Sequence, residues 1–221
     1  MMNISVIGAG YVGLITGIGF AKLNHQVSIV DLNDDLIKNL NENRPPFYEP
    51  ELVNYLNDSN IRNNLFFSTS YQKSINENTD IVFVCVQTPT DPDTGKTKTD
   101  YISSVLTELK KIESFNFIIC IKSTIKATLV EKISNEIDLD YKKIIFNPEF
   151  LREGSAFYDF FNPDRIVIGG SDQKGLNQCT ELYKSFDCEK IITDSNSSQM
   201  IKYLSNTYLA MRLSFVNETY R

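Results

Sequence analysis

The sequence predicts a doubly wound α/β fold, in which a mostly parallel sheet carries helices on both faces and a long C-terminal connecting helix follows. Short runs of β-branched and other apolar residues alternate with segments of helical periodicity over most of the chain. The runs are apolar throughout, as expected for parallel strands, because crossover helices cover both faces of a parallel sheet. From residue 195 onward the pattern stays helical.

The order of these elements defines the predicted topology. Buried parallel strands are predicted at residues 4–7, 26–30, 80–86, 117–121, 143–146, 165–168 and 190–192. Helices are predicted at residues 11–23, 33–43, 49–58, 100–113, 125–137, 172–185 and 195–221. A polar loop at residues 88–95 leaves the carboxyl end of the third predicted strand, and this edge of an open α/β sheet is where ligands bind.

Composition excludes several classes of protein. The chain has 221 residues, of which 42% are hydrophobic and 23% charged, so that neither a disordered nor a membrane protein is expected. The net charge of −6 and the absence of a basic patch argue against nucleic acid as a partner. The four cysteines contain no CxxC pair, which predicts a reducing cytoplasm and no metal site.

A glycine turn carries the first functional prediction. Gly8, Gly10 and Gly13 follow a predicted strand and open a predicted helix, as in the dinucleotide-binding turn of a Rossmann-like domain. Gly8 permits the tight turn, Gly10 lets the backbone approach a pyrophosphate, and Gly13 allows the helix to pack closely on the strand. Tyr11 and Val12 complete the turn.

Asp31 strengthens this prediction because it ends the second predicted strand. A carboxylate there can accept hydrogen bonds from the adenosine ribose and would repel a 2′-phosphate, so NAD is expected rather than NADP. Two alternatives remain open. The glycines could only pack a helix on a sheet, with Asp31 an ordinary strand-ending or N-cap residue, and a flavin nucleotide shares the same fingerprint.

Longer motifs resemble those of the UDP-glucose and GDP-mannose dehydrogenase family. The most specific is the stretch Asn147-Pro148-Glu149-Phe150-Leu151-Arg152-Glu153-Gly154. The resemblance covers nearly the whole chain, and its other matches are Gly10–Leu14, Tyr48-Glu49-Pro50, Val86–Thr90, Lys122-Ser123-Thr124, Asn162–Gly169, Lys202 with Asn206, and Phe215–Glu218. Members of this family oxidise a sugar C6 alcohol to a carboxylate with two NAD molecules, through a cysteine-bound thiohemiacetal and thioester.

The resemblance implies roles for particular residues. Val86, Thr88 and Pro89 should line the cofactor site, with Ser123 and Thr124 near the nicotinamide and the reacting water. The backbone from Phe150 through Leu151 and Arg152 to Glu153 should bind the UDP-sugar. Glu149 is the expected acid/base carboxylate, and Glu153 should touch both ligands. On residues alone, Asn147 could instead cap a helix that Pro148 starts, with both glutamates in its first turn.

Lys202 and Asn206 lie one turn apart on the last predicted helix and therefore share a face. An ammonium and an amide placed together can stabilise and orient one sugar oxygen. The pattern alone is also typical of the polar stripe on a solvated helix. The family position favours the catalytic interpretation.

The chain departs from the family pattern in ways that bear on activity. The family's nucleophilic cysteine lies in a glycine-rich segment that is missing here, and none of the four cysteines can be assigned that role. Leu36 stands where many relatives carry a basic residue, which could weaken NAD affinity. Lys126-Ala127 replaces a turn that usually contains proline, and Ser198-Gln199 replaces a common Ala-Glu. We expect both changes to have modest consequences.

The expected domain organisation follows from these observations. Residues 1–194 should form the NAD-binding domain and residues 195–221 the start of a dimerisation helix that lacks a C-terminal cap, with a UDP-binding domain absent. The expected reaction of the complete enzyme is oxidation of UDP-glucose to UDP-glucuronate, with this chain alone inactive. GDP-mannose or UDP-N-acetylmannosamine oxidation, and a stand-alone NAD-binding module, are the alternatives.

Overall fold

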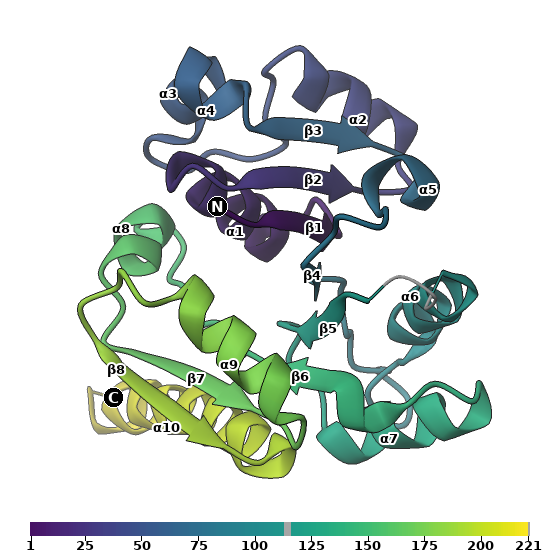
Figure 1. The fold of residues 1–221 in the computed structure, drawn as a ribbon. Helices are drawn as coiled ribbons and strands as arrows, with labels where there is room; N and C mark the ends of the chain where they lie inside the picture. Colours follow the sequence, from purple (N-terminus) through teal and green to yellow (C-terminus); the bar gives the residue numbers. More distant parts are fainter. Residues whose placement is uncertain (113–115, 221) are drawn as a thin grey trace.

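The computed structural model describes residues 1–112 and 116–220 and contains the predicted α/β architecture (Figure 1). Eight strands form one sheet in the order β3-β2-β1-β4-β5-β6-β7-β8. They are β1 (Asn3–Ile7), β2 (Gln26–Val30), β3 (Leu65–Ser68), β4 (Ile81–Val84), β5 (Ile118–Ile121), β6 (Ile144–Phe146), β7 (Arg165–Gly169) and β8 (Glu189–Thr193). The doubly wound order, with β1 in the middle and the chain moving outward in both directions, is confirmed.

Ten α-helices and a short 3₁₀ helix connect the strands in the described part of the chain. The α-helices are α1 (Tyr11–Lys22), α2 (Asp34–Asn41), α3 (Leu52–Asn57), α4 (Ser59–Arg62), α5 (Tyr71–Ser74), α6 (Asp100–Lys111), α7 (Ala127–Glu136), α8 (Ala156–Phe161), α9 (Gln173–Leu182) and α10 (Ser195–Tyr220), and the 3₁₀ helix is Tyr141–Lys143. Residues 113 and 221, which were predicted to be helical, lie outside the described residues.

Two apolar cores lie on opposite faces of the sheet because successive strand side chains point to opposite sides. One core packs α1, α2, α3, α4, α8 and α9 against residues such as Val6 and Ile29. The other packs α5, α6 and α7 against residues such as Ile7 and Val84. Both faces are therefore covered, as the uniformly apolar strands predicted.

The direction of the last two strands corrects the sequence prediction. Residues 165–168 and 190–192 were expected to continue the parallel sheet, but β7 runs antiparallel to β6, and β8 runs parallel to β7. A buried strand is apolar in either direction, so the pattern carried no information on this point. The only ladder pair between β6 and β7 in the described residues joins Phe146 to Gly169.

The antiparallel pairing of β6 and β7 brings Arg165, the first residue of β7, close to the segment that follows β6. Because Phe146 lies opposite Gly169 in an antiparallel pair, the chain that continues after β6 passes along β7 toward Arg165. Asn147 fixes this arrangement, since its amide donates to the Val167 carbonyl at 2.8 Å. The segment 147–155 therefore leaves the carboxyl edge of the sheet with β7 as a wall beside it.

Helix α10 packs against β7, β6 and α7 through its first turns. Gly169 permits this close approach, because a Cβ built there would lie 2.3 Å from the Ser198 hydroxyl oxygen. Beyond these turns the helix is exposed, and Figure 1 shows it running along the sheet as the last element of the chain. None of the helices in the described ranges is long and apolar enough to cross a membrane.

Candidate active site

The turn after β1 has the geometry of a phosphate cradle. Gly8 has φ +99°, a conformation that side chains rarely adopt, and its N–H donates to the Val30 carbonyl at 2.8 Å. A Cβ at Gly13 would lie 1.8 Å from the Gly8 carbonyl oxygen, so only glycine lets α1 start so close to the turn. By contrast, no atom lies within 4 Å of a Cβ built at Gly10.

The open space at Gly10 and the crowding at Gly13 are both expected for a turn that binds a dinucleotide. The space beside Gly10 is open to a ligand, and the first turn of α1 presents its N–H groups there without a side-chain cap. Helix N-termini of this kind bind phosphate oxygens through backbone N–H groups and the helix dipole. The residues present therefore fit an NAD pyrophosphate.

Asp31 lies directly after β2 and faces the glycine turn. Its carboxylate accepts a hydrogen bond from the Ala9 N–H at 2.8 Å and another from the Asn33 N–H at 3.0 Å. A carboxylate oxygen has capacity for more than one donor, so a ribose hydroxyl could still bind. Leu36, on α2, is partly buried and packs against the core.

The loops after β4 and β5 are joined by two hydroxyl groups. Ser123 donates to the Val86 carbonyl at 2.6 Å, and Thr88 donates to the Thr124 carbonyl at 2.8 Å. These bonds hold the predicted cofactor residues of the two loops together at the carboxyl edge of the sheet. Pro89 is exposed beside them.

Glu149 and Lys202 form a buried ion pair across the site. The Lys202 Nζ lies 2.8 Å from Glu149 Oε1, and the two side chains are 6% and 16% exposed. Glu149 also accepts a hydrogen bond from the Leu151 N–H at 2.7 Å. The residues from 147 to 154 form a loop, and α8 begins only at Ala156. The alternative interpretation, in which Pro148 starts a helix, is therefore wrong.

Phe150 carries two cations against its ring. The Arg165 guanidinium lies 4.5 Å from the ring centroid and the Lys202 ammonium 5.2 Å from it. Arg165 also donates to the Ser205 hydroxyl at 3.2 Å. Cation–π contacts of this kind fix the positions of both cations without neutralising them.

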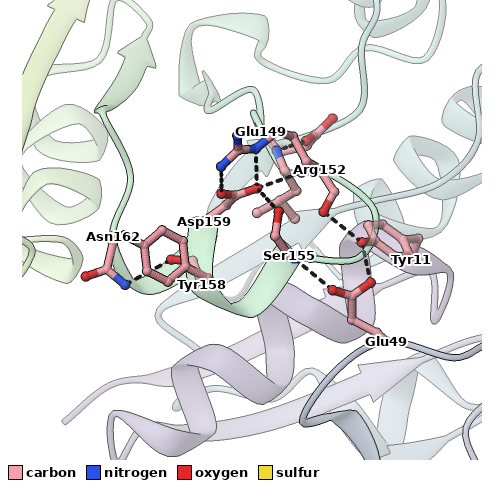
Figure 2. Close-up of polar contacts among 10 residues, drawn as sticks. Tyr11, Glu49, Glu149, Arg152, Ser155, Tyr158, Asp159 and Asn162 are labelled. Carbon is pink, nitrogen blue, oxygen red and sulfur yellow. Dashed lines mark hydrogen bonds and ion pairs between the residues drawn. The ribbon is translucent and has the colours of Figure 1, made fainter.

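Arg152 is clamped beside the same loop (Figure 2). Its guanidinium forms an ion pair with Asp159 at 2.5 Å, and its backbone N–H donates to the same carboxylate at 2.9 Å. Burial opposes ionisation of Asp159, but the bonds from Arg152 and Ser155 outweigh it and lower the pKa of that carboxyl. The charged carboxylate therefore shapes the 152–155 turn.

A cavity of about 470 Å³ brings together most of the predicted substrate residues. The predicted residues that line it are Glu149, Phe150, Leu151, Arg152, Lys202 and Asn206. Thr124 and Glu153 do not line it, and Glu153 is exposed. A second cavity, of about 480 Å³, lies at the amino edge of β1 and β2 and has no charged lining among the described residues, so the first is the candidate for catalysis.

The sequence interpretation assigned no role to several buried polar residues of this region. Lys122 is 6% exposed, and its ammonium bonds the Asn147 side-chain oxygen at 2.9 Å, while burial lowers its pKa. Tyr183 donates to the same oxygen at 2.6 Å. Glu49, 3% exposed, contacts Tyr11 and the 154–156 backbone. Lys122 and Glu49 both belong to motifs shared with the family, and this was the signal in the sequence that could have identified them.

Three of the four cysteines have thiols in an environment unlike that of a nucleophile, and the fourth, Cys179, is fully buried. Burial raises the pKa of the Cys85 thiol to about 12 and holds that of Cys120 well above its usual value. The Cys188 thiol also has a raised pKa, chiefly through burial. Reactive thiols need a lowered pKa. No group of three or more potential ligand residues in the described ranges is arranged to hold a metal ion.

Comparison with known proteins adds independent findings. Residues 2–187 match the NAD-binding domain of the UDP-glucose/GDP-mannose dehydrogenase family. UDP-glucose 6-dehydrogenase YwqF of Bacillus subtilis is 36% identical over 225 residues, covering 98% of this chain and 50% of the relative. The UDP-glucose 6-dehydrogenase of Rhizobium meliloti is 36% identical over 227 residues, covering 98% and 52%.

Solved structures give the same result. A UDP-glucose dehydrogenase from the archaeon Pyrobaculum islandicum superposes with a TM-score of 0.89 and 34% identity, covering 99% of this chain and 52% of that one. The GDP-mannose dehydrogenase of Pseudomonas aeruginosa gives a TM-score of 0.87 at 28% identity, covering 98% and 52%. The chain spans about half the length of these relatives. It belongs to the UDP-glucose/GDP-mannose dehydrogenase family and contains the NAD-binding domain of that family.

Proposed function

We propose that this chain binds NAD at its glycine turn and supplies half of the active site of a UDP-glucose 6-dehydrogenase. The reaction would oxidise the C6 alcohol of UDP-glucose to the carboxylate of UDP-glucuronate, with two NAD molecules accepting the two hydrides. The observation that carries this proposal is the buried Lys202–Glu149 pair in a cavity that Asn206 and residues 150–152 also line. The identity of 36% to two UDP-glucose 6-dehydrogenases supports this choice of substrate.

The proposed roles follow from the chemistry of the groups. The Lys202 ammonium would stabilise negative charge on the sugar oxygen, because a donor already placed in a buried site needs no reorganisation. Asn206 would orient the same oxygen or a water. Glu149, held by Lys202 and by the Leu151 N–H, would accept and return the proton of the reacting hydroxyl or water.

The remaining predicted residues are proposed to serve the cofactor. Gly8, Gly10, Tyr11, Val12 and Gly13 would hold the pyrophosphate and Asp31 the ribose, while Val86, Thr88, Pro89, Ser123 and Thr124 would line the nicotinamide end. Glu153, exposed on the 147–155 loop, would reach both ligands only when they are bound. These assignments rest on the motifs together with the carboxyl-edge placement of the loops.

The domain organisation remains part of the proposal. Residues 1–194 would be the NAD-binding domain and residues 195–221 the start of a connecting helix that pairs with a second copy of the chain, in a cytoplasmic homodimer. The exposed apolar side chains along α10 support a partner for this helix; they include Leu204, Tyr208, Leu209, Leu213, Phe215 and Val216. The UDP-binding half would come from outside these residues.

The alternatives differ in substrate or in class. The structural likeness to a GDP-mannose dehydrogenase supports GDP-mannose as the second candidate substrate, and UDP-N-acetylmannosamine oxidation is a further variant of the same chemistry. A stand-alone NAD-binding module is the alternative from another class, and the raised thiol pKa values of Cys85 and Cys188 favour it over an independent enzyme.

Two measurements on the purified chain test the proposal. Titration calorimetry with NAD should show binding, and an absorbance assay for NADH with UDP-glucose should show no turnover by this chain alone. Absence of NAD binding would contradict both the enzyme and the module. Rapid turnover of UDP-glucose would overturn the claim that catalysis needs a cysteine from elsewhere, and turnover of GDP-mannose alone would change the substrate.

A further inference from the structure

Glu49 is a buried carboxylate that joins two parts of the proposed site. It precedes α3 and is 3% exposed. Its Oε2 lies 2.8 Å from the Tyr11 hydroxyl and 2.9 Å from the Gly154 nitrogen, and its Oε1 lies 2.8 Å from the Ala156 nitrogen. Figure 2 shows Glu49 between Tyr11, at the start of α1, and the backbone around Ser155.

The environment of Glu49 accounts for a carboxylate at this position. None of the hydrogen bonds and ion pairs to Glu49 in the described residues comes from a lysine or arginine, so its charge is balanced by donors alone. Three hydrogen bonds to a charged acceptor can stabilise it inside a protein. A glutamine would place an NH₂ group against at least one of these donors and leave it unpaired.

Tyr11 makes the connection to the dinucleotide turn. It is the first residue of α1, directly after Gly10, and its ring packs on Phe47 at 5.1 Å. Its hydroxyl also lies 3.2 Å from the Arg152 carbonyl oxygen. Burial, with Glu49 beside it, raises the pKa of Tyr11 well above its usual value, so the hydroxyl stays a proton donor.

We propose that Glu49 is a positioning residue that couples dinucleotide binding at the glycine turn to the order of the 147–155 loop and the start of α8. Phosphate bound to the first-turn N–H groups of α1 restricts Tyr11, because Tyr11 carries one of those groups. A restricted Tyr11 holds the Glu49 carboxylate and the Arg152 carbonyl, and Glu49 holds the N–H groups of Gly154 and Ala156. The loop is therefore more ordered when the dinucleotide is bound than when it is absent.

The coupling must act in both directions. If NAD orders the loop, a ligand that orders the loop raises the affinity for NAD by the same factor. This proposal rests on the proposed binding of NAD at the glycine turn. It adds a specific route, from Tyr11 through Glu49 to the loop backbone, that the motif-based assignments do not contain.

Hydrogen–deuterium exchange of the 221-residue chain tests this route. Peptides covering residues 8–14 report binding at the turn, and peptides covering residues 150–156 report the loop. In the wild type, saturating NAD should slow exchange in both, by about fivefold or more in the loop. In Glu49→Gln and in Tyr11→Phe, NAD should still slow exchange at the turn but should no longer slow it in the loop.

A matched control is Tyr55→Phe. Tyr55 lies on α3 and packs on Phe157 of α8 at 4.8 Å, but its hydroxyl accepts a hydrogen bond from Lys22 rather than touching the loop. This variant should keep the wild-type response in both peptides. Thermal unfolding identifies any variant that fails to fold, and Tyr11→Phe keeps its ring packing if Glu49→Gln does not fold.

The outcomes separate the two proposals. Protection by NAD at the turn without any in the wild-type loop overturns the coupling and leaves the function standing. Loss of loop protection in Tyr55→Phe as well, or its retention in folded Glu49→Gln and Tyr11→Phe, also overturns the coupling. No protection at the turn in the wild type overturns NAD binding itself.

Discussion

At the scale of single residues, Gly13 is needed for close packing of α1 on the turn, whereas Gly10 leaves space for a ligand. A Cβ at Gly13 would overlap the Gly8 carbonyl, whereas a Cβ at Gly10 meets no atom within 4 Å, and Gly10 has an ordinary φ of −74°. Gly13→Ala should therefore destabilise the fold by about 1–3 kcal/mol or more. Gly10→Ala should leave the fold intact but weaken NAD binding, which urea unfolding and calorimetry measure.

Comparing Gly10→Ala with Gly13→Ala separates the effect on folding from the effect on NAD binding. Both variants add one methyl group within the same turn, so a general effect of alanine would change both properties in both proteins. Equal NAD affinity for Gly10→Ala and the wild type would show that the space beside Gly10 is not the pyrophosphate site.

The Lys202–Glu149 pair gives a second prediction at this scale. Lys202→Met should lower the free energy of unfolding by about 3–5 kcal/mol, because it leaves the Glu149 carboxylate buried without its cation. Urea unfolding measures this loss. The double variant Lys202→Met with Glu149→Leu should recover most of it, since no unpaired charge remains.

A double variant that is no more stable than Lys202→Met would show that the pair adds nothing beyond packing. Both variants should be inactive in a complete enzyme.

Sequence motifs pointed to the residues of the proposed site but not to the residues that support them. Glu149 and Lys202 were found through motifs, and the structure brings them to 2.8 Å. The Asn147 side chain, which bonds Lys122, Tyr183 and Val167, could not be inferred. Its partners come from three distant segments of the chain, and only the folded structure places them together.

At the scale of elements, the position of α10 depends on one glycine of β7. Gly169→Ala would place a Cβ 2.3 Å from the Ser198 hydroxyl oxygen and 2.7 Å from the Asp194 carbonyl. The helix must then move away from β7, which should cost about 1–3 kcal/mol. Because Lys202 follows Ser198 by about one turn, its coupling to Glu149 should weaken as well, as a double-mutant cycle would measure.

Gly170→Ala is a useful comparison. Its added Cβ would meet the end of the Ile145 side chain at 2.6 Å, not α10. It should alter stability but leave the coupling between Lys202 and Glu149 unchanged. A wild-type coupling energy in Gly169→Ala would contradict this account of how α10 is positioned.

The elements themselves were largely predictable, and the misses have physical causes. Strand β3 was not predicted, because its four residues, Leu65–Ser68, include none of the β-branched residues that mark the other strands. The predicted helix at 49–58 corresponds to α3, and the short helix α4, which was not predicted, follows it after Asp58, whose side chain accepts from the Asn60 N–H and caps α4. Local capping by Asp58 starts α4, and a four-residue helix is too short for its apolar periodicity to be recognised in the sequence.

At the scale of the whole molecule, the single histidine dominates the pH dependence of stability near neutrality. Burial first, and then the N-terminal charge, lower the pKa of His25 from its unfolded value of 6.5. The folded state therefore favours neutral His25, whose Nδ1 accepts from the Met2 N–H at 3.1 Å. Its contribution is complete above pH 6.5 and is lost as pH falls through the lower folded-state pKa.

We expect the free energy of unfolding of the wild type to decrease as pH is lowered below about 6.5. His25→Gln should be less stable at pH 7 but nearly independent of pH between about 5 and 7. Urea unfolding across this range checks the prediction. A wild type whose stability is constant over this range would contradict it.

The seam between β6 and β7 has a mechanical consequence. In the described residues a single ladder pair joins the six-strand part of the sheet to the β7–β8 part, so few backbone hydrogen bonds resist relative twisting of the two parts there. The 470 Å³ cavity spans this seam, with Glu149 on one side and Arg165 and Lys202 on the other. We expect any relative twisting of the two parts to widen and narrow the proposed sugar site while leaving the glycine turn unchanged.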